Sequence, residues 1–375
     1  MRILITNAYL DLYAGTQVMV RDLALELRRQ GHEPVVYSPR LGPVAEEIRD
    51  SGIAITDQLT SVATAPDIIH GQHHPAIEAL LRFPSTPAVY VCHSSVSGYT
   101  EALSYFPRIL RYVAVDEPCK SRIASVPAIP REHIAVIWNA VDLARFQPRD
   151  ALPARPKRAL VFSNNAGRAT YLGAVRTACR QAGLQLDVTG LLFGNSVPNP
   201  ETLLPRYDIV FAKARCALEA MAVGNAVVLC DFKGLGPMVS INNFDSLRPM
   251  NFGSRLLVNP LRPELIREEI ERYDPNDAAR VCQRVRSECG LAEAARRWIE
   301  LYTAVIEEFR SSGRNLDEEF RALADYWREW NYARRVDWEM EQLRKLRSVP
   351  VIGGALMYFA RRVLRNRFGV YHGTG

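Results

Sequence analysis

The chain lacks several features that would assign it to a special class of protein. It has no run of 18 or more apolar residues, so we expect no transmembrane helix. Its seven cysteines include no Cys-x-x-Cys pair, which excludes the common zinc and dithiol motifs and favours reduced thiols in a cytoplasmic protein. The first apolar run ends at Asn7 and is too short for the core of a secretory signal. A buried first strand is the better interpretation.

The overall composition is that of an ordinary globular protein. Hydrophobic residues make up 48% and charged residues 23% of the 375 residues, a length that typically corresponds to two domains. The net charge is +6. Residues 341–375 contain seven basic side chains and one acidic side chain, so the whole excess of positive charge lies in this tail.

Short β-branched runs alternate with helical patterns through most of the chain. Such alternation indicates βαβ units and parallel sheets. A stretch rich in Pro and Arg at 151–158 indicates a linker, after which the pattern restarts. We therefore predict an α/β protein with two domains of similar design, 1–150 and 151–310, and a helical, basic extension, 311–375.

Open parallel sheets hold ligands at the carboxyl ends of their strands, where loops lead into helix N-termini. The first such loop is 7–17, in which Gly15 lets the backbone approach a ligand and the following helix offers free N–H groups to an anion. This loop lacks the G-x-G-x-x-G fingerprint, so a dinucleotide is not favoured. A plain strand-to-helix turn would explain the same residues.

A second loop, within 207–231, carries two cations at the start of a predicted helix. Lys213 and Arg215 suit a diphosphate, because charge-assisted hydrogen bonds and the helix dipole act together there. Glu219 follows among apolar residues, and a carboxylate in such a helix needs a partner. Paired ribose hydroxyls would provide one partner. A salt bridge to Arg215 at the i,i+4 spacing would provide another.

The stretch ALEAMAVGNAVV at 217–228 resembles the signature of the large retaining glycosyltransferase family built on the GT-B fold. The usual form of that signature is Glu, seven residues, then Glu-Ala-Met-Ala-x-Gly-x-Pro-Val-Val. Four further segments agree with the family in order and spacing: GTQVMVRDLALELRRQGHEPVVYS, PDIIHGQHH, AVYVCHSS and VIWNAVDLARFQP. Each segment alone is a weak signal, whereas five in the right order, spread over residues 1 to about 305, are specific.

The resemblance implies two Rossmann-like domains whose parallel sheets face an interdomain cleft. It implies a glycosyltransferase of the hexosyl type that needs neither a metal nor a cofactor. Such an enzyme moves a sugar from a nucleotide-sugar donor to a glycan or lipid-linked acceptor, as in polysaccharide biosynthesis. The configuration of the transferred sugar is retained. His93 would lie beside the donor sugar as the active-site histidine, and Glu219 would bind the ribose. The donor-binding residues that the resemblance and the charge pattern together predict are Gly15, Arg168, Lys213, Arg215 and Glu219.

Three departures from the family pattern change this expectation. Counting back from Glu219, Phe211 stands where the first Glu of the signature is expected, and the usual Gly three residues later is Ala214. In the family, that first carboxylate contacts the hydroxyls of the donor sugar. The usual Arg and Lys after the first strand of the second domain are reduced to Arg168. We therefore expect the nucleotide half of the site to be retained and the sugar half to be rebuilt.

These departures leave other functions open. A nucleotide-sugar epimerase or hydrolase on the same fold would need an acid/base pair, of which only His93 can be named. A non-catalytic subunit that binds nucleotide sugars would need no such pair, and His93 would then be a core histidine at a strand end. His70, His73 and His74 do not have a recognisable ligand spacing, so we predict no metal site.

The C-terminal region has a pattern of its own. From Asn315, a typical N-cap residue, to Arg347 there is no Gly or Pro, which predicts one long helix. Its apolar stripe consists of Leu316, Phe320, Leu323, Trp327 and Trp330. In 348–368 an apolar segment precedes four arginines, a combination that suits the anionic inner face of a membrane. A packed helix with a solvated face is the alternative, and no motif indicates nucleic-acid binding.

Overall fold

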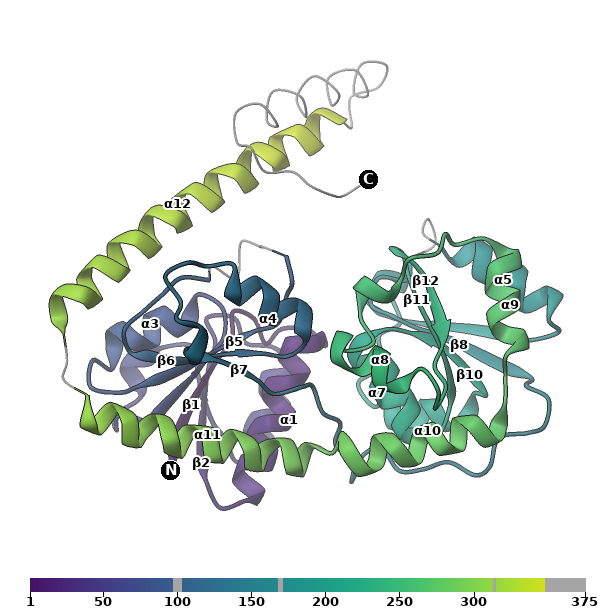
Figure 1. Ribbon diagram of the computed structural model, residues 1–375, viewed down its shortest axis with the longest axis horizontal. Helices are drawn as coiled ribbons and strands as arrows, with labels where there is room; N and C mark the ends of the chain where they lie inside the picture. Colours follow the sequence, from purple (N-terminus) through teal and green to yellow (C-terminus); the bar gives the residue numbers. More distant parts are fainter. Residues whose placement is uncertain (97–102, 168–170, 313–314, 348–375) are drawn as a thin grey trace.

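The computed structural model describes residues 1–96, 103–167, 171–312 and 315–347, with side chains as far as Asn331. These residues form two α/β domains that lie side by side, followed by two long helices (Figure 1). The predicted fold of two Rossmann-like domains with a helical C-terminal extension is confirmed.

The first domain is built on a seven-stranded sheet in which every strand runs parallel to its neighbours, in the order β3-β2-β1-β4-β5-β6-β7. Its central strands are almost continuously apolar because helices cover both faces of the sheet. The strands are β1 (Arg2–Thr6), β2 (Glu33–Tyr37), β3 (Ala54–Thr56), β4 (Ile68–Gly71), β5 (Ala88–Cys92), β6 (Ile109–Ala114) and β7 (Ile134–Val136). The helices are α1 (Gly15–Arg29), α2 (Pro43–Asp50), α3 (Pro75–Arg82) and α4 (Glu117–Ala124).

The second domain has a five-stranded sheet in the order β12-β11-β10-β8-β9. Its strands are β8 (Arg158–Phe162), β9 (Gln185–Thr189), β10 (Ile209–Ala212), β11 (Ala226–Asp231) and β12 (Gly234–Met238). The sheet departs from the predicted parallel arrangement at one edge, where β12 runs antiparallel to β11. Only two residues separate these strands, too few for the crossover that a parallel pair needs. The main helices are α5 (Leu172–Gln181), α7 (Ala214–Val223), α9 (Pro263–Glu271) and α10 (Pro275–Glu288).

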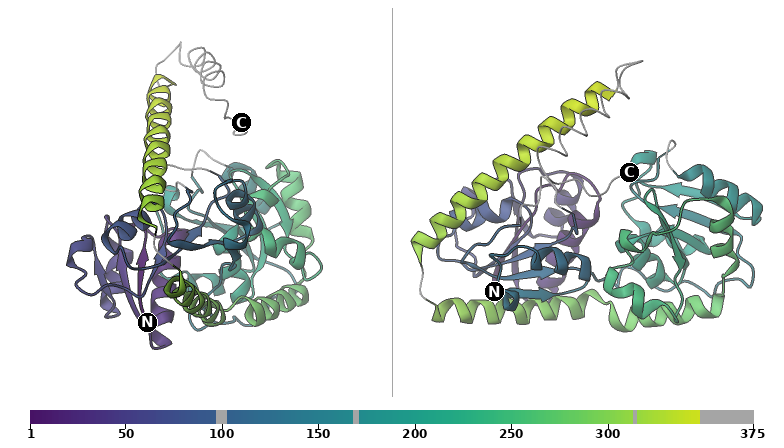
Figure 2. Two further views of the ribbon diagram at one scale, coloured as in Figure 1. Left: turned by 60° about the vertical axis from the view of Figure 1, so that its left-hand side comes forward. Right: turned by 45° about the horizontal axis from the view of Figure 1, so that its top comes forward.

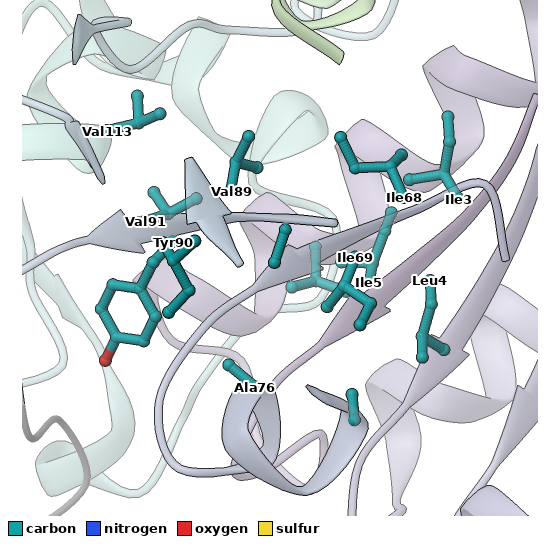
Figure 3. Packing of buried hydrophobic residues seen from close by; sticks show 14 of the residues in the cluster. Ile3, Leu4, Ile5, Ile68, Ile69, Ala76, Val89, Tyr90, Val91 and Val113 are labelled. Carbon is teal, nitrogen blue, oxygen red and sulfur yellow. The ribbon is translucent and has the colours of Figure 1, made fainter. Parts of the chain in front are cut away.

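The core of the first domain forms where β1, β4, β5 and β6 present their apolar side chains to the surrounding helices. Figure 3 shows part of this packing, with Ile3 close to Ile68 and Ile5 close to Ile69. Full burial of such side chains contributes about 1.5–3 kcal/mol each, which makes this sheet a stable base for the loops at its carboxyl edge.

Helix α11 (Leu291–Ser311) returns from the second domain and runs along the first, as both views in Figure 2 show. Five of its side chains belong to the hydrophobic core of the first domain: Ala295, Trp298, Tyr302, Val305 and Ile306. Tyr302 also contacts the interior of the sheet through its hydroxyl, which lies 2.7 Å from Nδ1 of the buried His70. The predicted second domain, 151–310, therefore ends in a helix that packs against the first.

The predicted long helix is present as α12 (Leu316–Arg347), and Asn315 caps it by accepting a hydrogen bond from the N–H of Glu318. The predicted apolar stripe is buried only in part: Leu323 and Trp330 pack against the first domain, whereas Leu316, Phe320 and Trp327 are more than half exposed. The helix docks through mixed aromatic and polar contacts, which include Tyr326 with His74, Trp330 with His74, Glu319 with Arg108 and Glu329 with Ser104. Within the described part of the chain, no helix combines the length and apolar composition that crossing a bilayer requires.

Two segments cross between the domains, and they lie against each other. Val141, in the first crossing, accepts a backbone hydrogen bond from Leu291 and donates one to Cys289 in the second crossing, each 2.9 Å long.

Candidate functional site

A cavity lies in the cleft between the two domains, and residues of both domains form its wall. The first domain contributes the loop after β1 and the first two turns of α1. The second domain contributes the carboxyl ends of β8 and β9, the segment 196–200 and the start of α7. This is the edge at which open parallel sheets hold their ligands.

Gly15 is the first residue of α1 and lines the cavity. No acidic residue occupies the first turn of this helix and no side chain caps it, so its early N–H groups are available to an anion. A Cβ atom built on Gly15 would meet no atom within 4 Å. The glycine is therefore not required by packing within the protein, and the space in front of it is open.

Helix α7 begins immediately after β10, with Lys213 as the only connecting residue. Position 211, where the family signature has its first carboxylate, therefore lies inside β10. Phe211 is a fully buried residue inside β10, and there is no loop from which a side chain at that position could reach a sugar. Ala214 adopts φ +50°, a left-handed conformation that favours glycine, at the position where the family has Gly.

Three predicted donor-binding residues, Gly15, Arg215 and Glu219, line the same cavity from opposite sides. Arg215 Nε donates to Glu219 Oε1 at 2.7 Å, so the i,i+4 salt bridge that the sequence left open is formed. Burial raises the pKa of the Glu219 carboxyl, although the charge of Arg215 opposes that rise. A buried carboxylate with one occupied oxygen retains acceptor sites for hydroxyl donors.

The ion pair extends across the cleft into the first domain. Arg215 also donates to Asp22 Oδ2, and the other Asp22 oxygen accepts from Arg21 Nη2 at 2.7 Å. Arg21 in turn contacts Glu47 at 2.8 Å. Burial alone would lower the pKa of Arg215, but the charges of Asp22 and Glu219 raise it, so this guanidinium remains positive beside the cavity.

Lys213 does not line this cavity. Its Nζ lies 3.1 Å from Asp231 Oδ2, and Asp231 is fully buried at the end of β11. Asp231 also accepts hydrogen bonds from Asn165 Nδ2 and from the backbone N–H of Phe232. Lys213 thus belongs to a second polar cluster at the same edge of the sheet. The predicted Arg168 lies outside the described residues.

His93 follows β5 at the carboxyl edge of the first sheet and is not among the residues that line the cavity. Its ring centroid lies 6.3 Å from that of His73, whose Nδ1 lies 3.0 Å from Asn7 Oδ1. Burial, together with His73 and His70, holds the pKa of His93 well below the ordinary value, so the ring is neutral at physiological pH. Among the residues that the structure describes, no three His, Cys, Asp or Glu side chains are grouped so that they could hold a metal ion.

Sequence reasoning missed several residues of the cavity. Arg21 lies on a helix face that has no special sequence pattern, and Arg145 comes from the junction segment. Asn164 follows β8 and donates through Nδ2 to Tyr13 O at 2.7 Å, across the cleft. Its position two residues beyond the end of β8 was a usable signal, whereas only the folded structure brings Arg21 and Arg145 to the site.

Comparison with protein families matches residues 13–145 to Glycosyltransferase Family 4, which confirms the resemblance found in the sequence. Among curated proteins, no significant sequence match is found. Solved structures that share the fold include the following three. A glycosyltransferase from Rickettsia africae has a TM-score of 0.60 at 15% identity, covering 81% of this chain and 98% of its own.

HepE from Anabaena, solved in complex with UDP and glucose, has a TM-score of 0.60 at 13% identity, covering 81% of this chain and 100% of its own. Sucrose-phosphate synthase from Thermosynechococcus elongatus has a TM-score of 0.58 at 14% identity, covering 82% of this chain and 99% of its own. At these identities the likeness establishes a shared GT-B fold.

Proposed function

We propose that this chain, whose first domain matches Glycosyltransferase Family 4, transfers a hexose-type sugar from a nucleotide-sugar donor to a glycan or lipid-linked acceptor. The observation that supports this proposal is the interdomain cavity. Its wall includes Arg21 from α1, Arg215 and the buried Glu219 from α7, and the first turns of both helices. Helix N-termini and arginines suit a diphosphate, and a buried carboxylate suits a ribose.

In this proposal Glu219 accepts hydrogen bonds from the ribose hydroxyls with the acceptor sites that Arg215 leaves open. The diphosphate lies between Arg215 and the start of α1, close to Gly15. Arg168 would add a further cation, whereas Lys213 stays paired with Asp231 in the neighbouring polar cluster. HepE, which shares the fold, was solved with UDP and glucose, which supports a nucleotide sugar as the ligand class.

The proposed reaction retains the anomeric configuration. The bond between the sugar and the diphosphate breaks first, and the leaving diphosphate gains negative charge. Fixed positive groups that already point at this position lower the barrier, because they need no reorganisation at the moment of reaction. Arg215, Arg21 and the helix N-termini supply that charge, so the proposed mechanism requires no metal. The phosphate itself takes the proton of the acceptor hydroxyl.

His93 is proposed to lie beside the donor sugar. Because its pKa is held low, the ring acts there as a neutral hydrogen-bonding group and not as a cation. A neutral histidine can orient a hydroxyl group without competing with the arginines for the diphosphate.

A thermal-shift screen against UDP, GDP, CDP and ADP, each with and without EDTA, tests the proposal. We expect one nucleoside diphosphate to raise the Tm by several degrees in both conditions, since a ligand at 100 times its Kd adds about 2.7 kcal/mol of stability. A Tm that no nucleotide changes would contradict the donor site. A shift that EDTA abolishes would contradict metal independence.

The segment 348–368 lies outside the described residues, and its membrane role remains a proposal from the sequence. We propose that it holds the protein on the anionic, cytoplasmic face of a membrane, where a lipid-linked acceptor would be found. Removal of residues 348–375 should then reduce co-sedimentation with vesicles that contain phosphatidylglycerol by at least about tenfold. The full chain and the shortened chain should both bind neutral vesicles weakly. Equal co-sedimentation of both chains with the anionic vesicles would contradict it.

A further inference from the structure

Asp22 contacts two arginines that line the cavity, although it does not line the cavity itself. One carboxylate oxygen accepts from Arg21 Nε at 2.9 Å and Nη2 at 2.7 Å, and the other accepts from Arg215. The Asp22 side chain is 3% exposed, so both ion pairs lie in a region that excludes water. Both oxygens of this carboxylate are therefore committed to cations of the site.

The two arginines come from different domains. Arg21 and Asp22 belong to α1, whereas Arg215 belongs to α7, at the opposite wall of the cleft. The contact between Asp22 and Arg215 is thus a buried ionic link between the domains, at the point where the proposed diphosphate would lie. Figure 1 shows α1 and α7 on the two sides of the interdomain boundary.

The position of Arg215 is fixed by two carboxylates at once. Its Nε donates to Glu219 and its Nη2 donates to Asp22. A guanidinium is planar and rigid, so two anchored nitrogens fix the direction of its remaining N–H groups. Without Asp22, the guanidinium could rotate about the remaining contact with Glu219.

Arg215 borders two hollows of the cleft. It lines the main cavity together with Glu219, and it also lines a smaller hollow together with Asp22 and Trp298. Asp22 therefore contacts Arg215 from the smaller hollow and leaves the main cavity to Arg215 and Glu219.

We infer that Asp22 is a positioning residue of the donor site, which holds Arg215 from the opposite domain so that the site is complete only when the domains are closed. This inference rests on the proposed function for the identity of the ligand. The interdomain link itself does not depend on that identity, so the two can be tested separately.

The test is a double-mutant cycle of Asp22→Asn and Arg215→Gln. Calorimetry measures the affinity for the nucleoside diphosphate that stabilises the wild-type protein. Small-angle scattering measures the radius of gyration of the free protein. Asp22→Asn should weaken nucleotide binding about tenfold, as expected for loss of one charge-assisted contact. In the Arg215→Gln background, the same change should alter the affinity less than about twofold, because its effect passes through Arg215. A residue that only stabilised the fold would give additive losses.

In the free protein, Asp22→Asn and Arg215→Gln should each enlarge the radius of gyration, and the double variant should show no further increase. Arg215→Gln leaves Asp22 paired with Arg21, so it decides the scattering result even if Asp22→Asn fails to fold. Glu308→Gln is the control, because it removes a 2.7 Å ion pair with Arg111 that lies away from the cleft. It should change neither affinity nor dimensions.

Unchanged affinity and unchanged dimensions in Asp22→Asn would overturn the inference, as would additive effects in the cycle. If the wild-type protein binds none of the four nucleoside diphosphates, the proposed function fails, and the scattering comparison alone decides whether Asp22 links the domains.

Discussion

Replacing Glu219 with glutamine should weaken nucleoside diphosphate binding about 30- to 150-fold, as measured by calorimetry. The substitution preserves shape but removes the negative charge that the ribose hydroxyls would meet in a buried site. Hydrogen bonds to charged groups contribute about 2 to 3 kcal/mol, and each 1.4 kcal/mol corresponds to about tenfold in affinity. The amide would also present a donor to Arg215, where the carboxylate now accepts.

The second domain offers a matched control for this change. Asp208 is also buried and also lies near an arginine, Arg149, but at the opposite edge of the same sheet, where it accepts from the backbone N–H groups of Lys157 and Arg158. Asp208→Asn should lower the Tm and leave nucleotide affinity unchanged. If Asp208→Asn weakened binding as much as Glu219→Gln, the effect of Glu219 would be one of general stability, and its role at the ribose would be refuted.

Replacing Gly15 with leucine should abolish nucleotide binding while the protein remains folded. The open space in front of Gly15 accommodates a side chain, and the glycine does not have a positive φ, so leucine fits this helix position. The side chain would fill the place of the proposed diphosphate. Forcing several extra carbon atoms into an occupied site costs up to about 3 kcal/mol and occasionally more, so we expect a loss of affinity of about 100-fold.

Gly173 provides the comparison for this second change. It lies in the first turn of α5, and a Cβ atom there also meets no atom within 4 Å. Gly173→Leu should therefore keep wild-type affinity, and circular dichroism should show an equal or higher Tm for both variants, because leucine is the better helix former. Normal binding by Gly15→Leu would show that the ligand does not approach this helix start.

Much of the fold could be predicted from the sequence, because its signals are local. Strand and helix periodicities identify the two α/β units, and the absence of Gly and Pro identifies α12. The packing of α11 against the first domain could not be predicted in the same way. The stripe that includes Trp298 and Tyr302 shows that one face of α11 is buried, but it does not show which domain buries it.

Three residues that line the cavity, Gly15, Arg215 and Glu219, could be picked out from the sequence because family motifs and strand ends coincide there. The ionic network around Arg215 could not be predicted from the sequence. Asp22 and Arg21 lie next to each other in an ordinary amphipathic helix, and their partner, Arg215, is almost two hundred positions further along the chain. Such a contact depends on how the two domains are joined, which no local pattern encodes.

The contribution of α11 and α12 to the first domain has a consequence for biosynthesis. The sheet of that domain is complete by Val136, yet Trp298, Tyr302 and Tyr326, which cover part of it, are translated more than 160 residues later. At elongation rates of about 5–20 residues per second, the nascent chain would leave this apolar surface uncovered for roughly 10–40 seconds. During that interval the first half of the protein is a natural client for ribosome-associated chaperones, and premature termination before α11 would yield a fragment prone to aggregation.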